Sequence, residues 1–245
     1  MYKRQYRDNG TTSLHPQDGN ALALLYNLTL DASQTSSISE KLTLNWNSIG
    51  PVTPELPDTI SPFVSGLEVL AHLRTEQPLR ALQLMQRLWG FLLDSPLMTG
   101  STIAEGITAN GSLYYRSTAG YDYDASYTSL SHGWSTAPVQ AMVFEMLGLE
   151  ITGLGGKTWT LHPRPAGLAG LQGGYHTPLG RFDASITVEN HGRRVTSTVS
   201  TPIASEGQLT HDGGWKTILL NGKACHTTEN VCKVPGGLST VVVEL

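Results

Sequence analysis

The hydrophobic pattern of the sequence changes near residue 152, and this change constrains the possible folds more than any other feature. Before it, apolar residues recur at helical spacing. After it, short β-type runs alternate with turn signals such as Asn-His-Gly and Asn-Gly. Helices followed by strands are typical of an α/α segment joined to a β domain. The 245 residues are enough for both. We therefore predict two domains, residues 1–152 and 153–245.

Five helices are expected in the first domain. Asp18 is a plausible cap for the first, and Ser37 with Glu40 fits a capping box for the second. Four prolines between residues 50 and 62 predict a long loop. The helices that follow this loop are close enough in sequence to form an antiparallel hairpin. The expected helices start near residue 17 and cover about residues 36–45, 63–73, 77–93 and 136–147.

The second domain is predicted to be an antiparallel β-sandwich. Its clearest strand alternates apolar side chains at Phe182, Ala184, Ile186 and Val188. Regularly spaced short strands separated by turns favour a sandwich over parallel βαβ units. The expected strands cover residues 158–162, 168–175, 181–188, 193–201, 217–220 and 240–245.

Charge and motif content exclude several functions. The formal net charge is -4, and the 16 basic residues are spread thinly, so nucleic acid is not an expected partner. No apolar run reaches the length of a transmembrane helix. The histidines lack paired ligand spacing, and there is no phosphate loop or Gly-x-Ser-x-Gly elbow, so we expect neither a metal nor another cofactor. Cys225 and Cys232 could form a disulfide or remain buried thiols.

The N-terminal residues and three glycosylation triplets bear on location. The first ten residues carry positive charge but are not followed by the apolar region of a signal peptide. Acceptor triplets begin at Asn9, Asn27 and Asn110. The start of the chain therefore resembles the interior of a larger secreted protein. We expect an extracellular location.

Glu105, His132 and Trp134 are the candidate site residues. They fall within two neighbouring stretches, residues 101–115 and 128–140. A carboxylate can act as a base for water, an imidazole can hydrogen-bond to hydroxyls, and an indole offers a flat apolar face to a pyranose ring. This combination predicts a sugar site. A solvated glutamate, a helix-capping histidine and a core tryptophan are the alternative structural interpretations. Other aromatic residues could add sugar platforms or simply pack: Trp46, Tyr114, Tyr115, Tyr121, Tyr123 and Tyr127.

Several motifs occur in an order that is similar to a known enzyme family. They are QDGNALAL at 17–24, SPFVSGLEVLAHL at 61–73, TGSTIAEG at 99–106, SLSHGWSTAP at 129–138 and, in the β domain, GGKTWTLHPRP followed by TPLGRFDASI. Together they resemble the C-terminal half of the inverting α-L-rhamnosidases of glycoside hydrolase family 78, in the six-hairpin glycosidase superfamily. The resemblance implies the C-terminal portion of an (α/α)6 barrel over residues 1–152, followed by a C-terminal β-sandwich over residues 153–245.

The resemblance also implies roles for the candidate residues. Glu105 matches the family's general base, and His132 and Trp134 match its sugar-binding HGWS motif. Ala104 stands where the family usually has tryptophan. The family's general acid lies on an upstream segment with no match here, so the second carboxyl group of an inverting pair is missing. Four other acids lie in or beside loops and are weak candidates for it: Asp18, Asp58, Asp122 and Asp124.

Three functions follow as hypotheses. The first is hydrolysis of terminal α-L-rhamnosyl linkages, with a rhamnose-containing glycoside or polysaccharide as substrate and Glu105 as base. The second is a non-catalytic carbohydrate-binding or scaffold remnant that lacks the acid. The third is another six-hairpin glycosidase or lyase. Because a partial barrel exposes apolar helix faces, we also expect self-association or an upstream segment that covers them.

Overall fold

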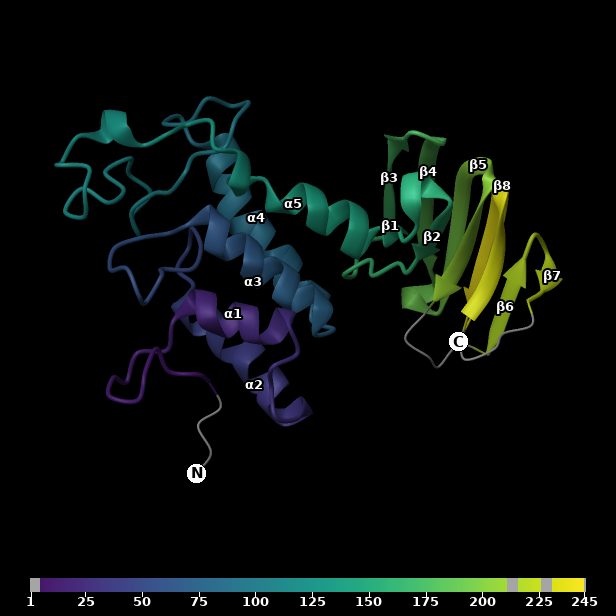
Figure 1. Cartoon of the computed structure of the whole chain (residues 1–245), viewed down its shortest axis with the longest axis horizontal. Helices are drawn as coiled ribbons and strands as arrows, with labels where there is room; N and C mark the ends of the chain where they lie inside the picture. Colours follow the sequence, from purple (N-terminus) through teal and green to yellow (C-terminus); the bar gives the residue numbers. More distant parts are fainter. Residues whose placement is uncertain (1–4, 211–215, 226–230, 245) are drawn as a thin grey trace. The chain divides into compact units, whose positions relative to one another are not determined.

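The computed structural model describes residues 5–210, 216–225 and 231–244, and the chain divides into two compact units (Figure 1). Met1–Val139 contains the first four α-helices, and Gln140–Leu245 contains the described strands together with the π-helical segment Ala141–Met146. The order of helices before strands matches the sequence pattern. The division lies N-terminal of the expected boundary at 152–153, because Leu147 and Leu149 belong to the buried core of the strand-containing unit.

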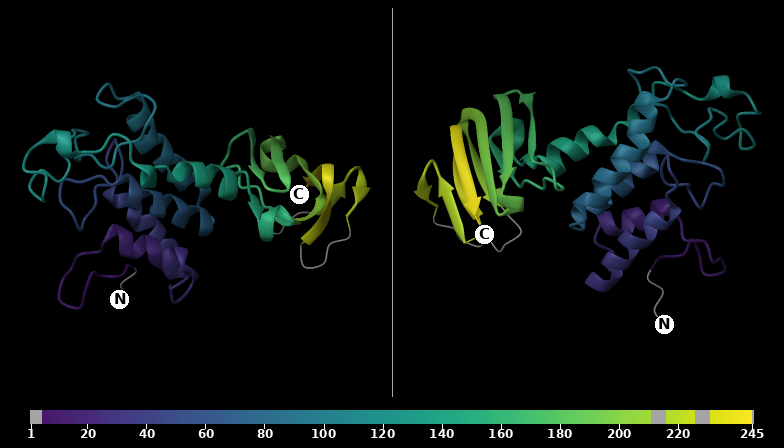
Figure 2. Two further views of the ribbon diagram at one scale, coloured as in Figure 1. Left: turned by 45° about the horizontal axis from the view of Figure 1, so that its top comes forward. Right: turned by 180° about the vertical axis from the view of Figure 1, so that it is seen from behind.

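The first unit is built on four α-helices, seen from two further sides in Figure 2. α3 packs against the other three and forms the predicted antiparallel hairpin with α4. Ser61 caps α3, and the prolines that open α3 and α4 occupy first-turn positions, where a missing N–H is tolerated. The helices are α1 (Gln17–Leu25), α2 (Ala32–Leu42), α3 (Pro62–Arg74) and α4 (Pro78–Asp94). The fifth, α5 (Ala137–Gln140), continues as the π-helical segment η4 (Ala141–Met146).

The start of α2 differs from the capping-box prediction. The helix begins at Ala32, and the Asp31 side chain accepts a hydrogen bond from the backbone N–H of Gln34 at 2.7 Å. Ser37 therefore lies inside the helix and is buried. Asp31 and Ser37 both precede helix-compatible sequence, and the earlier cap is the one that forms.

Replacing Asp31 with alanine should destabilise the helical unit by about 1 kcal/mol, because the Gln34 N–H loses its acceptor. Denaturant unfolding followed by the helical circular dichroism signal measures this loss. Ser33→Ala, an exposed change in the same helical turn, is the control and should have little effect. Equal stability of the two variants would contradict the assignment of Asp31 as the cap.

The start of α1 is also capped in an unexpected way. Pro16 occupies the N-cap position, and Asp18 lies inside the first turn rather than at the cap. The carboxylate of Glu55, from the proline-rich loop, accepts hydrogen bonds from the backbone N–H groups of Gln17 and Asp18 at 2.8 and 3.1 Å. Burial raises the pKa of Glu55, although these hydrogen bonds oppose the effect. The loop thus supplies the cap that α1 itself lacks.

The second unit contains one eight-stranded sheet. Its main path runs β1-β2-β5-β8-β6-β7, and β3 pairs with β4, which pairs with β5. All pairs are antiparallel except β2 with β5. The strands are β1 (Leu149–Ile151), β2 (Thr158–Leu161), β3 (Gly170–Thr177), β4 (Gly180–Glu189), β5 (Arg194–Thr210), β6 (Thr217–Leu220), β7 (Lys223–Ala224) and β8 (Val231–Glu244).

The sequence predicted an antiparallel β-sandwich, and the structure joins the eight described strands in one hydrogen-bonded sheet with one parallel pair. β5 is 17 residues long and passes through an irregularity between Thr201 and Glu206. Its first part pairs with β4 and its last part with β2, while β8 pairs with both parts. Trp159, Phe182 and other side chains from β1, β2, β4, β5 and β8 share one buried core. The long strand β5 therefore connects β2, β4 and β8 in a single sheet.

Cys225 and Cys232 form a disulfide next to this sheet. Cys232 lies in β8 and is fully buried, whereas Cys225 directly follows β7. Of the two alternatives left open by the sequence, the structure has the disulfide. Within the described part of the chain, no helix combines the length and apolar character needed to cross a membrane.

Candidate active site

The two stretches that carry the candidate residues lie side by side in the helical unit. The Glu105 N–H donates to the Ser129 carbonyl at 2.8 Å, and the His132 N–H donates to the Ile103 carbonyl at 2.9 Å. These bonds pair residues 103–105 with residues 129–132 in antiparallel fashion. Backbone pairing therefore fixes the Glu105 segment beside the His132 segment.

Glu105 is a buried carboxylate held by a tyrosine. Its side chain is 7% exposed, and Oε1 accepts a hydrogen bond from the Tyr121 hydroxyl at 2.8 Å. Oε2 has a longer contact, 3.5 Å, with the Ser129 N–H. The hydrogen bond to Glu105 is the main cause that raises the pKa of Tyr121, and burial followed by the nearby Glu105 charge raises that of Tyr115. The arrangement keeps a carboxylate among tyrosine hydroxyls.

The glycine after Glu105 allows Tyr115 to pack closely. A Cβ atom at Gly106 would lie 2.6 Å from the Tyr115 ring, which is closer than real Cβ atoms approach. Tyr115 is itself buried. A side chain at position 106 would therefore displace the ring that borders the Glu105 carboxylate.

His132, Trp134 and Phe63 form an aromatic cluster on the surface. The ring centroids of His132 and Trp134 are 4.2 Å apart, and those of Phe63 and Trp134 are 5.4 Å apart. Trp134 is 54% exposed and Phe63 is 45% exposed. The next residue, Ser135, is buried, and its carbonyl accepts from the Trp89 indole. The backbone next to Trp134 is therefore held in place by a buried hydrogen bond, while the indole ring stays accessible, as a sugar platform requires.

Phe63 was not a candidate from sequence because it fits the apolar period of α3. The helical period alone placed it with the buried Leu70 and Leu73. Its position in the first turn, immediately after Pro62, instead leaves the ring half exposed. The sequence does contain one signal for this exposure: Phe63 is an aromatic residue in the first helical turn, directly after a proline-rich loop.

The four loop acids differ in their surroundings. Asp58 accepts from the Ala109 N–H at 3.1 Å, and Asp124 caps the short helix η2 (Ala125–Tyr127). Hydrogen bonds from Ser126 lower the pKa of Asp124, opposite to the shift that suits a general acid. Asp18 lies in α1, and Asp122 is exposed.

A second buried carboxylate, Glu68, was missed by the sequence analysis. Glu68 and His72 are both fully buried on α3 and lie 3.3 Å apart. The Glu68 carboxylate also accepts from Gln17 Nε2 at 2.6 Å and Trp46 Nε1 at 2.7 Å. His72 Nδ1 contacts the Ser39 hydroxyl, which accepts from Arg80. This network ties α1, α2, α3 and α4 together, and it uses the Trp46 indole internally rather than as a sugar platform.

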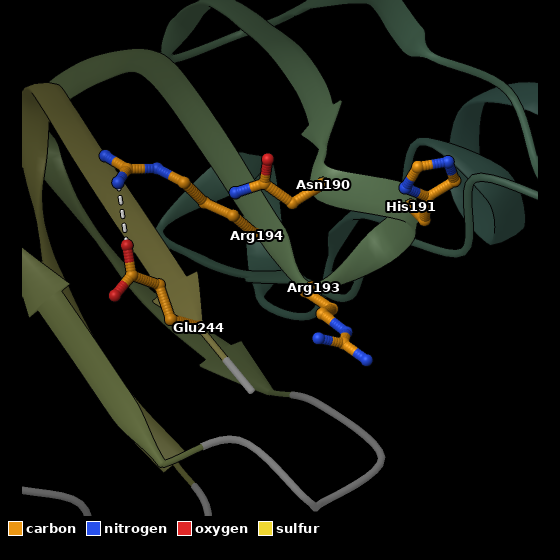
Figure 3. A pocket seen from close by; sticks show the side chains of 5 residues that line it. All are labelled: Asn190, His191, Arg193, Arg194 and Glu244. Atoms are coloured by element: carbon orange, nitrogen blue, oxygen red, sulfur yellow. Dashed lines mark hydrogen bonds and ion pairs between the residues drawn. The ribbon is translucent and has the colours of Figure 1, made fainter.

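The strand-containing unit has a shallow polar pocket at the turn between β4 and β5 (Figure 3). Arg194 is paired there with Glu244 at 2.7 Å and with Glu189 at 3.2 Å. Its described lining contains no Trp, Tyr or Phe and so offers no platform for a sugar ring: Asn190, His191, Arg193, Arg194 and Glu244. Across the described residues, no group of three or more His, Cys, Asp or Glu side chains is placed to hold a metal ion.

Solved structures share this fold, although no family model and no curated sequence matches the chain. The α-L-rhamnosidase of Streptomyces avermitilis complexed with L-rhamnose is 15% identical, with a TM-score of 0.68 over 98% of this chain and 22% of that one. That of Dictyoglumus thermophilum is 14% identical, with a TM-score of 0.70 over 100% and 27%. The glycoside hydrolase family 78 rhamnosidase of Bacillus sp. GL1 is 20% identical, with a TM-score of 0.63 over 86% and 21%.

The fold is therefore that of a segment of a carbohydrate-active enzyme. More specifically, it is the fold of part of the α-L-rhamnosidases, and this confirms the resemblance seen in the sequence at the level of structure. The chain spans 21–27% of the length of these three proteins.

Proposed function

We propose that this chain forms part of an inverting glycoside hydrolase that removes terminal α-L-rhamnosyl groups. The observation that carries the proposal is the likeness to rhamnosidase structures, which extends over 98–100% of this chain in two comparisons. The helical unit would be the C-terminal portion of an (α/α)6 barrel, and the strand-containing unit its C-terminal domain. The substrate would be a rhamnose-containing glycoside or polysaccharide.

Glu105 is the proposed general base. In an inverting reaction, a carboxylate takes a proton from water as that water attacks the anomeric carbon, and a second carboxyl group protonates the leaving oxygen. The Tyr121 hydroxyl donates a hydrogen bond to Oε1 of Glu105, so Oε2 is the oxygen that would receive the proton from water. The partner acid would stand about 6.5–9.5 Å away so that water fits between the two groups.

The aromatic cluster is the proposed sugar platform. Trp134 would pack on an apolar face of the pyranose, Phe63 would extend that surface, and His132 would hydrogen-bond to ring hydroxyls. The half-exposed indole supports this role, because a ring of this size is otherwise better buried.

The direct test is hydrolysis of an aryl α-L-rhamnoside by the 245-residue chain, with L-rhamnose binding measured in parallel by calorimetry. Release of the aryl group, together with rhamnose as the inverted β anomer at early times, is the expected result. Release of the retained anomer, or cleavage of aryl β-D-glucosides in preference, would contradict the proposal and favour another six-hairpin glycosidase.

The runner-up function is a non-catalytic rhamnose-binding module. The observation that favours it is the accessible aromatic cluster beside a carboxylate without a described acid partner. Rhamnose binding without turnover, weakened roughly tenfold by Trp134→Ala, is its expected signature, since one stacking contact is worth about 1 kcal/mol or more. Tyr26→Ala removes a similarly exposed ring and is the control.

An extracellular location belongs to the same proposal. The disulfide between Cys225 and Cys232 favours an oxidising compartment. Asn9, Asn27 and Asn110, which open the three glycosylation triplets, are all exposed and so are accessible for modification.

A further inference from the structure

The tyrosine-rich segment between Leu113 and Thr128 folds back over Glu105. Its ends are joined by a hydrogen bond from the Thr128 hydroxyl to the Leu113 carbonyl at 2.8 Å. Between these ends, the Tyr121 hydroxyl reaches Glu105 at 2.8 Å. No sequence pattern placed Tyr121 there, because the two residues are 16 positions apart and the segment lacks helical or strand periodicity.

The Tyr121 ring is supported on several sides. Tyr115 meets it edge-on with centroids 5.9 Å apart, and Tyr127 lies tilted against it at 5.9 Å. The Arg116 guanidinium carbon is 5.7 Å from the ring centroid. The titratable and charged groups that face Tyr121 are therefore Glu105, Tyr115, Tyr127 and Arg116. These contacts restrict the direction in which the hydroxyl points.

We propose that Tyr121 is a positioning residue that fixes the Glu105 carboxylate with Oε2 turned toward the attacking water. The inference rests on the proposed function, because it concerns the base of that reaction. A phenol has one hydrogen to donate, so its bond to Oε1 holds the carboxylate plane and leaves the other oxygen as the acceptor. A hydrogen bond to a charged acceptor is among the stronger ones in proteins.

The Glu105 hydrogen bond also keeps Tyr121 in its donor form. It raises the pKa of Tyr121 above the ordinary value of 10.0. At neutral pH the hydroxyl therefore retains its hydrogen, and the bond persists throughout the range in which a glutamate base operates.

The decisive variant is Tyr121→Phe, which keeps the ring and removes only the hydroxyl. We expect kcat for the aryl rhamnoside to fall roughly 10- to 100-fold with KM nearly unchanged, because a charged hydrogen bond is lost without loss of the platform. Tyr123→Phe removes an exposed hydroxyl from the same segment and should change neither kcat nor KM. An unchanged kcat in Tyr121→Phe would overturn the proposal.

A measurement without turnover separates this proposal from the proposed function. Carbon-13 labelling of the tyrosine ring reports each hydroxyl's ionisation by NMR, and Tyr121 is assigned by its absence from Tyr121→Phe. Its ionisation should occur at higher pH in the wild type than in Glu105→Gln. A Tyr121 signal that is indifferent to Glu105 overturns the positioning role. If the ionisation of Tyr121 depends on Glu105 but the wild type hydrolyses no rhamnoside, the hydrogen bond between the two residues is supported and the proposed function is contradicted.

Discussion

Glu105→Gln is expected to lower kcat for an aryl α-L-rhamnoside by about 100- to 10,000-fold, the usual contribution of a general base. The amide oxygen can still accept the Tyr121 hydrogen bond, so the local structure should remain while the acceptor for the water's proton is lost. Initial rates at saturating substrate measure the effect. Thermal unfolding of the variant should match that of the wild type.

A matched variant makes the Glu105 result specific. Asp124→Asn makes the same change of charge at an exposed acid in the neighbouring tyrosine-rich segment. It should leave kcat within about twofold, since surface substitutions away from a site have small effects. If Glu105→Gln retained full activity, the base would have to be another residue and the site assignment would be wrong.

Glu68→Ala should destabilise the helical unit by about 3–5 kcal/mol, because each buried polar group left without its hydrogen-bond partner costs roughly 1–3 kcal/mol. Gln17 and Trp46 would each lose an acceptor, and His72 would lose its carboxylate neighbour in a fully buried position. Denaturant unfolding followed by the helical circular dichroism signal is the measurement, because it reports on the helical unit rather than on the sheet.

Two further variants test whether the loss of stability comes from breaking the buried hydrogen-bond network or only from removing a negative charge. Glu40→Ala removes a carboxylate from the exposed face of α2 and should change stability by no more than about 0.5 kcal/mol. Glu68→Gln retains an acceptor oxygen, so its loss of stability should lie between those of Glu68→Ala and Glu40→Ala. A loss below about 1 kcal/mol for Glu68→Ala would show that Glu68 and its partners do not hold the helices together.

The sequence predicted the helices best where the apolar period was strong. The α3–α4 hairpin follows from apolar residues at helical spacing and from the short connection between the two helices. The same period misled at Phe63, which lies on the apolar face but at the exposed end of the helix. The apolar period also gave no sign that Glu68 and His72 are buried. Their burial depends on polar partners from α1, α2 and α4, which lie too far away in the sequence for a local pattern to show.

The six expected strands were placed in the correct order, but two were predicted too short, and β1 and β7 were not predicted. The expected strands at 193–201 and 240–245 overlap β5 and β8, which extend over Arg194–Thr210 and Val231–Glu244; Leu245 lies outside the described residues. Between the expected and the observed strand ends lie Pro202, Gly236 and Gly237, which are residue types that commonly interrupt strands. The irregularity in β5 accommodates them, and Gly236 is needed because a Cβ there would lie 2.3 Å from the Pro202 carbonyl oxygen. Turn residues thus mark a bulge as readily as a turn.

The roles of Glu105, His132 and Trp134 remain proposals, but their arrangement has a physical basis. The sequence grouped them through motif order, and the structure brings the two stretches together through backbone hydrogen bonds. Tyr121 could not have been found in advance, because its contact depends on how an irregular segment of the chain folds over the site.

The backbone pairing of residues 103–105 with residues 129–132 brings the two ends of the intervening segment together, so this segment is an insert that starts and ends at nearly the same place. Its ends are fixed by these backbone hydrogen bonds and by the Thr128–Leu113 bond, so we expect changes of length or side chains within the segment to leave the Glu105 backbone beside that of His132. Loop closure depends only weakly on length, at about 0.6 kcal/mol per doubling. Replacing this insert alone would therefore change the groups that surround the Glu105 carboxylate, and it gives an engineer a single segment to vary.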